Sequence, residues 1–169
     1  MDYVAEGRKI IEHEKQALDL TLNALGVDFG RAVELVMTCL GRVMVSGMGK
    51  SGLIGAKVSA TLASTGTPSY FIHPAEAVHG DLGRIHADDL VILLSNSGET
   101  AEVVRLLPTL KKIGATLVVI TGRRESTMAR YAEVVLHIGD ISEACPLNLA
   151  PSSSTTAMLV VGDALALTV

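Results

Sequence analysis

The sequence predicts an α/β fold with a doubly wound, flavodoxin-like sheet of five parallel strands, preceded by helices. Short apolar runs alternate with helix-length segments, which is the pattern of successive βαβ units. The runs VILLS and LVVIT are continuously hydrophobic rather than alternating, as expected for parallel strands that helices cover on both faces. The expected strands are Val43–Ser46, Tyr70–Ile72, Leu90–Ser95, Leu117–Thr121 and Val134–Ile138.

Helices are expected before, between and after these strands. Apolar residues at helical spacing predict a first helix over Tyr3–Leu25 and a second over Phe29–Leu40, with Asp28 as the N-cap of the second. A crossover helix is expected over Glu99–Ile113, and a final apolar helix over Thr155–Val169. In a doubly wound sheet, ligands bind beyond the carboxyl ends of the strands, so the residues that follow each strand are the candidates for function.

Composition favours one soluble domain. The 169 residues fit a single compact unit, with helices over residues 1–40 and an α/β core over residues 41–169. The charged N-terminus lacks the apolar core of a secretory signal, and no apolar stretch is long enough to span a bilayer, so a cytoplasmic location is expected. A net charge of −4 argues against nucleic-acid binding. Cys39 and Cys145 are expected to be buried thiols.

The loop GMGKSG, from Gly47 to Gly52, follows the first predicted strand. It formally matches the dinucleotide motif G-x-G-x-x-G, but the second strand runs into His73 instead of the acidic residue that would hold a ribose. A P-loop would need a glycine at the position of Met44. We therefore expect an anion-binding turn with Lys50 beside it, and the alternative is a tight turn with a solvated lysine.

The third strand runs directly into SNSGET, residues Ser95–Thr100. The hydroxyls of Ser95, Ser97 and Thr100 can donate hydrogen bonds to phosphate oxygens, and Gly98 permits close approach of the backbone. The helix predicted after them would direct its positive end at the phosphate. An ordinary N-cap made by Ser97 or Thr100 is the alternative, but one cap accounts for one hydroxyl and not for three.

Two histidines, His73 and His79, follow the second strand within HPAEAVHGDLG. A neutral imidazole can move a proton at a sugar ring oxygen, a step that any isomerase acting on a cyclic sugar must assist. A pair of histidines is more often structural, and a zinc site would need a third ligand that the sequence does not define. All three interpretations stay open.

Two glutamates are candidates for a general base. Glu143 follows the fifth strand in apolar company, where partial desolvation would make it a competent base, and Glu102 begins the crossover helix. Either could equally be a surface carboxylate. The later serine run, which includes Ser152 and Ser153, is either an N-cap cluster for the final helix or a second set of phosphate contacts.

Six segments together resemble the SIS (sugar isomerase) domain of the arabinose-5-phosphate isomerases of the lipopolysaccharide Kdo pathway. They are GMGKSG, ASTGTP, HPAEAVHGDLG, SNSGET, TGRRESTMAR and EACPLNLAPSSSTTA. The resemblance covers almost the whole chain from Val43 onward. SNSGET alone indicates only a SIS domain, whereas HPAEAVHGDLG with EACPLNLAPSSSTTA is specific to this isomerase family.

The resemblance implies an aldose–ketose isomerase that interconverts ribulose 5-phosphate and arabinose 5-phosphate through an enediolate and supplies Kdo biosynthesis. It implies catalytic importance for Lys50, Glu102 and Glu143. We assign oxyanion stabilisation to Lys50 and proton removal to Glu143, with Glu102 as the competing base. The residues expected to bind substrate are Gly47, Gly49, Ser51, Gly66, Thr67, His79, Ser95, Ser97, Thr100, Ser152 and Ser153.

The resemblance implies that no cofactor is required, and that a zinc ion at His73 would be incidental or inhibitory. It also implies a homotetramer with active sites at subunit interfaces. The largely apolar first and last helices independently predict a dimer or tetramer, because they leave more hydrophobic surface than one small sheet can cover. No nucleic-acid or membrane partner is expected.

Longer members of the family continue into a further SIS segment with an important histidine, and many end in a pair of CBS domains. Neither is present in the 169 residues, so we expect this chain to bind substrate and to turn it over poorly. The rival classes are a non-catalytic SIS sensor of sugar phosphates, another SIS phosphosugar isomerase, and a nicotinamide-binding protein. The missing acidic residue disfavours the last of these.

Overall fold

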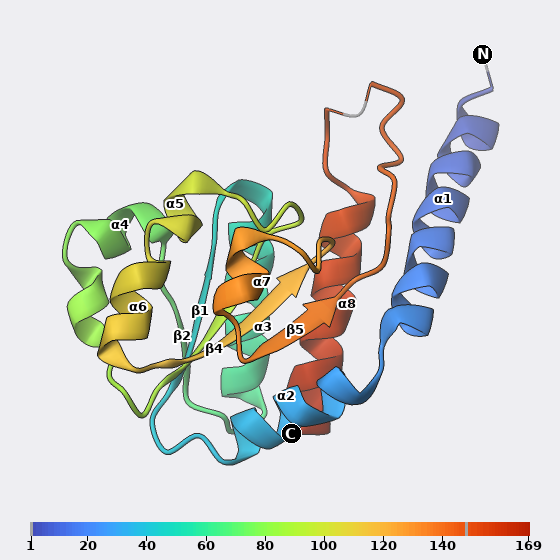
Figure 1. The fold of residues 1–169 in the computed structure, drawn as a ribbon. Helices are drawn as coiled ribbons and strands as arrows, with labels where there is room; N and C mark the ends of the chain where they lie inside the picture. Colours follow the sequence, from blue (N-terminus) through green and yellow to red (C-terminus); the bar gives the residue numbers. More distant parts are fainter. Residues whose placement is uncertain (1, 148) are drawn as a thin grey trace.

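The computed structural model describes residues 2–147 and 149–169 and confirms the doubly wound α/β fold (Figure 1). Five parallel strands pair in the order β2-β1-β3-β4-β5. They are β1 (Val43–Gly47), β2 (Ser69–Phe71), β3 (Leu90–Leu94), β4 (Thr116–Thr121) and β5 (Val134–His137). Their ends differ from the predicted ones by at most one residue.

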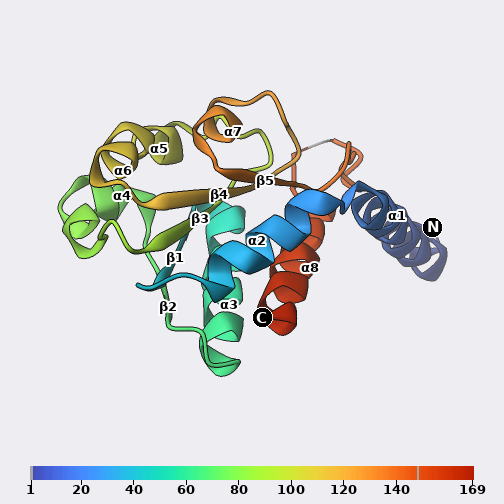
Figure 2. The ribbon, with the colours of Figure 1, turned by 60° about the horizontal axis from the view of Figure 1, so that its bottom comes forward.

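Helices cover both faces of the sheet, as Figure 2 shows. One face carries α2 (Val27–Met37), α3 (Gly49–Ser64) and α8 (Ser153–Thr168). The other carries α4 (Pro74–Val78), the 3₁₀ helix η1 (Asp81–Arg84), α5 (Ala101–Val104), α6 (Leu107–Ile113) and α7 (Thr127–Tyr131). The first helix, α1 (Tyr3–Ala24), lies beside α8 and outside these two layers.

Successive residues of the strands enter two separate cores. In β3, for example, Leu90, Ile92 and Leu94 pack with α2, α3 and α8, whereas Val91 and Leu93 pack with α5 and α6. All five of these side chains are buried. The continuous hydrophobicity of the central strands thus has the predicted cause, because such strands have no solvent-facing side.

Two helix predictions need correction. The crossover helix expected over Glu99–Ile113 is divided into α5 and α6, with Pro108 in the first turn of α6, where its missing N–H is tolerated best. Gly26, not Asp28, is the N-cap of α2, and Asp28 lies in the first turn of that helix. There its carboxylate pairs with Arg31 at 3.6 Å and with Arg124 at 3.7 Å.

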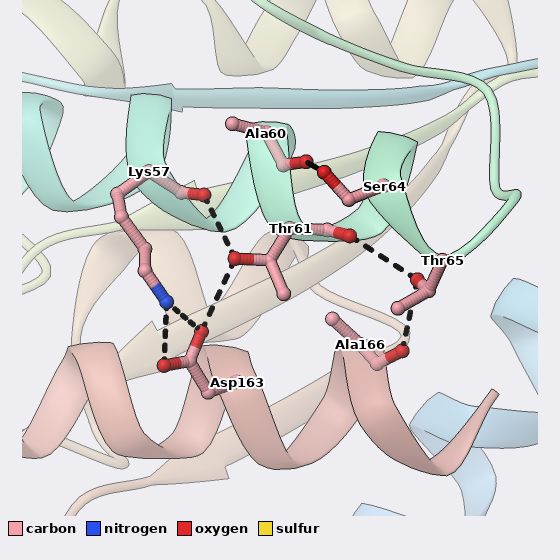
Figure 3. A network of polar contacts seen from close by, with 7 residues as sticks. All are labelled: Lys57, Ala60, Thr61, Ser64, Thr65, Asp163 and Ala166. Atoms are coloured by element: carbon pink, nitrogen blue, oxygen red, sulfur yellow. Dashed lines mark hydrogen bonds and ion pairs between the residues drawn. The ribbon is translucent and has the colours of Figure 1, made fainter.

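α3 and α8 lie side by side and are joined by an ion pair and hydrogen bonds (Figure 3). The Lys57 ammonium donates to both carboxylate oxygens of Asp163, at 2.6 Å to Oδ2. One turn of α3 later, Thr61 Oγ1 also donates to Asp163, and Thr65 Oγ1 donates to the carbonyl oxygen of Ala166 at 3.2 Å. Since later residues of α3 contact later residues of α8, the two helices run in the same direction and begin at the same edge of the sheet.

The two cysteines are less buried than the sequence predicts. Cys39 and Cys145 are half-buried and form no disulfide bond. Over residues 2–147 and 149–169, the structure contains no helix with the length and apolar character needed to cross a bilayer.

Candidate active site

The carboxyl ends of the strands form one edge of the sheet, where most of the predicted site residues lie. β1 and β3 are neighbours there, with Gly47 paired to Leu94. Their backbones approach so closely that a Cβ atom on Gly47 would lie 3.1 Å from the carbonyl oxygen of Leu94. The loops after β1 and β3 therefore open into the same crevice, where the chain switches from one side of β1 to the other.

Lys50 lies in the first turn of α3, directly after β1. Gly49 opens the helix with φ of +60°, a left-handed conformation that favours glycine. Gly52 lets the helix approach the strand, because a Cβ atom there would lie 2.5 Å from the carbonyl oxygen of Gly47. Within the described part of the chain, the exposed ammonium of Lys50 has no hydrogen-bond or ion-pair partner. It is therefore available to a bound anion.

The segment Ser95–Thr100, which we name the serine loop, gathers three hydroxyls at the end of β3. Ser95 Oγ lies 2.8 Å from Thr100 Oγ1 and 3.5 Å from Ser97 Oγ. Gly98 turns the loop with φ of +63°, and its N–H donates to Ser95 Oγ at 3.0 Å. A Cβ atom on Gly98 would lie 2.1 Å from Ser126 Oγ, so only glycine brings the loop against the turn after β4.

The serine loop differs from the predicted helix-end site. Because α5 has four residues, its dipole contributes less to anion binding than the long helix expected from the sequence. Thr100 is the N-cap residue of α5 but makes no side-chain capping bond, and Ser97 Oγ accepts from the N–H of Glu99 at 3.1 Å. Among the described residues, the N–H groups of Ser97 and Thr100 have no partner. The serine loop can therefore bind a phosphate through its hydroxyls and its unpaired backbone N–H groups.

The carboxylate of Glu99 faces away from this cradle, toward α7. Its Oε1 accepts a hydrogen bond from the N–H of Thr127 at 2.6 Å. This bond, with a smaller contribution from the Arg130 charge, holds the pKa of Glu99 below its usual value. The ionised side chain therefore joins the serine loop to α7.

Glu143 is held by the start of α8 and not by apolar neighbours, which corrects the sequence-based expectation. Its Oε2 accepts from the N–H groups of Ser152 at 2.8 Å and Ser154 at 3.4 Å, and its Oε1 accepts from the Ser154 hydroxyl. A carboxylate is favourable at a helix N-terminus because the first N–H groups have no partner within the helix. Glu143 is half-buried, and its orientation is fixed. Asn148, of the same motif, lies outside the described residues.

The two predicted bases reach the strand-end edge from different sides. Because α3 and α8 begin together, Glu143 at the start of α8 lies at the same edge as Lys50 at the start of α3. Glu102 is half-buried in α5, directly after the serine loop. In the described residues, the Glu102 carboxylate has no hydrogen-bond or ion-pair partner, in contrast to that of Glu143.

The two serines of the final motif have different surroundings. Ser153 is fully buried, and its Oγ accepts from the N–H of Ala144 at 3.2 Å. Its hydroxyl therefore holds the segment next to Glu143. Ser152 is the half-buried N-cap residue of α8 and makes no side-chain capping bond. Ser51, likewise half-buried, lies beside Lys50 in the first turn of α3.

The histidines lie at the two ends of the short helix α4. Nδ1 of His73 accepts from the N–H of Ala75 at 3.3 Å, so this imidazole is the N-cap of α4. His79 is exposed at the C-cap. No group of three His, Cys, Asp or Glu side chains in the described ranges could hold a metal ion. The residues present therefore do not fit a resident zinc site.

Gly66 and Thr67 lie at the opposite edge of the sheet. They follow the C-terminus of α3 and precede β2, while Lys50 is at the N-terminus of α3. A helix of 16 residues spans about 24 Å, so within one chain these residues do not share a crevice with Lys50.

Two arginines for which the sequence predicts no role lie beside the serine loop. Arg123 and Arg124 line a cleft of about 660 Å³ together with Ser97, His137 and Asp140. The three predicted catalytic residues do not line this cleft, so it lies next to the crevice between β1 and β3 and does not coincide with it. The position of both arginines directly after β4 was the signal available in the sequence.

A family model described as the SIS domain matches residues 37–168. The chain therefore belongs to the SIS domain family.

Among its relatives is the arabinose 5-phosphate isomerase KdsD of Pseudomonas aeruginosa, 56% identical over 167 residues that cover 99% of this chain and 51% of the relative. KdsD of Escherichia coli K12 is 52% identical over 165 residues, covering 98% of this chain and 50% of the relative. The chain thus spans about half the length of these curated relatives. The structure of E. coli CFT073 c3406 in complex with A5P superimposes with a TM-score of 0.95 at 45% identity, covering 99% of this chain and 89% of that one.

Proposed function

We propose that this chain is the isomerase domain of an arabinose-5-phosphate isomerase, which interconverts ribulose 5-phosphate and arabinose 5-phosphate and supplies Kdo biosynthesis. One observation carries the proposal. The serine loop and Lys50 meet at one crevice, in a chain that is 45% identical to a protein whose structure holds A5P. The KdsD relatives support the same reaction.

In the proposed reaction, the serine loop grips the phosphate through the hydroxyls of Ser95, Ser97 and Thr100. This remote group does not react, so its binding energy positions the sugar carbons for proton transfer. Gly47, Gly49 and the side chains of Ser51, His79 and Ser152 complete the proposed contacts from the chain. Ser153 was also expected to bind substrate, but it is fully buried and its hydroxyl holds the segment next to Glu143 instead.

The proton moves between neighbouring carbons by way of an enediolate. Glu143 removes the proton from the carbon next to the carbonyl and returns it to the adjacent carbon, while Lys50 stabilises the developing oxyanion. Glu102 is the competing base, and its unpaired carboxylate supports that role. Loss of solvent deuterium incorporation into substrate in Glu143→Gln but not in Glu102→Gln would assign the proton transfer to Glu143.

No cofactor takes part in this reaction scheme. The chemistry needs a base and an electrophile, and both can be supplied by side chains. A zinc ion bound through the remaining ring nitrogen of His73 would be incidental or inhibitory. Activity in the presence of a chelator tests this part of the proposal.

The proposed assembly is a cytoplasmic homotetramer with active sites between subunits. Gly66 and Thr67 support this arrangement, because they reach a sugar near Lys50 only from another copy of the chain. The exposed apolar side chains of α1 and α8 also support self-association.

The deciding experiment incubates purified protein with ribulose 5-phosphate and a panel of other ketose phosphates, in chelator, and follows aldose formation. The expected result is arabinose 5-phosphate from ribulose 5-phosphate, with little product from hexulose phosphates. Tight binding of a sugar phosphate without isomerisation would instead identify a sensor. Turnover of another ketose phosphate in preference would identify a different phosphosugar isomerase.

A further inference from the structure

The segment that carries Glu143 is tied to the first helix as well as to α8. We name residues 139–147 the glutamate loop. Nε2 of His13, on α1, lies 2.9 Å from the carbonyl oxygen of Ser142 and 3.2 Å from Ser142 Oγ. Because a carbonyl oxygen only accepts hydrogen bonds, Nε2 carries the proton and donates it to Ser142. The contact joins residues 129 positions apart in the sequence.

α1 also holds the beginning of the glutamate loop. The buried hydroxyl of Thr21 donates to the carbonyl oxygen of Ile138 at 2.7 Å. Gly139, with φ of +98°, packs against Leu20, and a Cβ atom there would lie 3.2 Å from the Leu20 backbone. The loop thus leaves β5 along α1 and meets His13 one residue before Glu143.

The two ends of the Glu143 backbone are therefore fixed from different helices. On one side His13 holds Ser142 to α1. On the other side the N–H of Ala144 donates to Ser153 of α8, while the Glu143 carboxylate accepts from Ser152 and Ser154. Because α1 and α8 pack against each other, these two attachments together fix the position of Glu143 relative to both helices.

We propose that His13 is a positioning residue, which holds the glutamate loop so that the Glu143 carboxylate faces the bound sugar phosphate. The proposal rests on the proposed isomerase function. A base displaced by about 1 Å can lose about a hundredfold in rate. The serine loop, to which His13 makes no hydrogen bond, should still grip the phosphate. His13 therefore acts on turnover and not on substrate affinity.

The test compares His13→Ala, His13→Gln and Gln16→Ala in the full chain. Glutamine keeps a side-chain N–H donor for the Ser142 carbonyl, so it should rescue the function that alanine removes. Gln16 is the matched control, because it is exposed on the same helix and its side chain makes no hydrogen bond with the described residues. We expect kcat to fall about fivefold to tenfold in His13→Ala, the factor that loss of one ordinary hydrogen bond produces, with KM unchanged.

Hydrogen–deuterium exchange of peptides covering the glutamate loop provides a readout that needs no activity. Exchange should accelerate in His13→Ala and stay at the wild-type rate in His13→Gln and Gln16→Ala. Unchanged kcat and exchange in His13→Ala would overturn the proposal, as would equal losses in His13→Ala and His13→Gln. If the wild-type protein isomerises no sugar phosphate, the proposed function fails, while the exchange rates still decide whether His13 holds the loop.

Discussion

At the scale of single residues, the polar groups of the strand-end edge divide into those that are fixed and those that are unpaired. Ser95, Ser153 and Glu143 are held by hydrogen bonds, whereas Lys50 and Glu102 have no partner among the described residues. Fixed groups can be complementary to a ligand without reorganising when it binds. Unpaired charged groups gain the most interaction free energy when a ligand binds that carries an opposite charge or a transferable proton.

Replacement of Lys50 tests its proposed role in catalysis. We expect Lys50→Ala to lower turnover about a hundredfold to a thousandfold, because a preorganised donor at the oxyanion acts mainly in the transition state. Substrate affinity should change less, since the phosphate retains the serine loop. Steady-state kinetics and a separate binding titration measure the two effects.

The matched control for this variant is Lys112→Ala, which removes an exposed lysine from α6 and should leave both constants unchanged. Near wild-type turnover in Lys50→Ala would exclude Lys50 from the mechanism. Loss of binding in parallel with turnover would make it a phosphate ligand instead.

Asp89 gives a prediction for stability. Its carboxylate, 2% exposed, accepts from the N–H groups of Arg42 and His86, both at 2.8 Å, and from the Arg42 guanidinium. Burial acts to raise the pKa of Asp89, but these hydrogen bonds and the Arg42 charge outweigh it and hold the pKa below its usual value of 3.8. We expect Asp89→Ala to lower the free energy of unfolding by about 2–3 kcal/mol, because it removes several hydrogen bonds to a buried charged group.

The pH dependence of this loss follows from the direction of the shift. A carboxyl whose pKa is lower in the folded than in the unfolded protein stabilises the fold above the unfolded pKa, and this contribution is lost as the pH falls through the folded pKa. Urea unfolding should therefore show a constant difference between the wild type and Asp89→Ala above about pH 5 and a shrinking one below about pH 4. A difference independent of pH down to acid unfolding would contradict an ionic role for Asp89.

At the scale of secondary-structure elements, the contact between α3 and α8 brings the N-termini of these two helices to the same edge of the sheet. Lys50 lies at the start of α3, and the start of α8 holds Glu143. The Lys57–Asp163 pair is partly exposed, so it contributes little to stability by itself, and the close packing of the helices matters more. Gly162 makes that packing possible, because a Cβ atom there would lie 2.3 Å from Cγ2 of the buried Val58.

We expect Gly162→Val to lower the free energy of unfolding by about 1–3 kcal/mol, since the added methyl groups overpack a tight helix contact. The same substitution at Gly30 in α2 is the control. No heavy atom lies within 4 Å of a Cβ atom at that position, so Gly30→Val should change the stability by less than about 0.5 kcal/mol. Denaturant unfolding of both variants is the measurement, and equal losses would show that the α3–α8 contact is not the cause.

At the scale of the whole molecule, apolar surface remains uncovered on α1 and its neighbours. Tyr3, Ile11 and Leu22 of α1 are 79%, 70% and 69% exposed, and Leu53 of α3 and Leu167 of α8 are also exposed. Scattered apolar residues are normal on surfaces, but several on adjacent helices are typical of an interface.

We expect the chain to self-associate as a dimer or tetramer at micromolar concentration, measured by light scattering. Ile11→Glu and Leu22→Glu together should shift the mass toward the monomer, because charged side chains oppose burial in an apolar interface. The control is Lys111→Ala with Lys112→Ala, which changes the net charge by the same amount at exposed positions of α6. A monomeric wild type would refute self-association through these helices and weaken the proposed intersubunit sites.

The sequence determined the sheet almost completely. Hydrophobic runs of strand length, separated by turns and helical segments, predicted all five strands within one residue, because burial on both faces leaves a local and continuous signal. The serine loop was also predicted from the sequence, since its hydroxyls and glycine all lie within the short segment Ser95–Thr100. Helix boundaries were predicted less well, because the division between α5 and α6 and the cap of α2 depend on packing as much as on propensity.

Only the tertiary structure decided how distant segments meet. Nothing near Glu143 in the sequence predicts that α8 holds its carboxylate, or that His13 on α1 holds the loop before it, since these contacts join residues 9 to 129 positions apart. The resemblance put Gly66 and Thr67 near the same sugar as Lys50, whereas α3 places them at opposite edges of the sheet. Local pattern fixes which residues form each element, and the packing of elements fixes which side chains share a site.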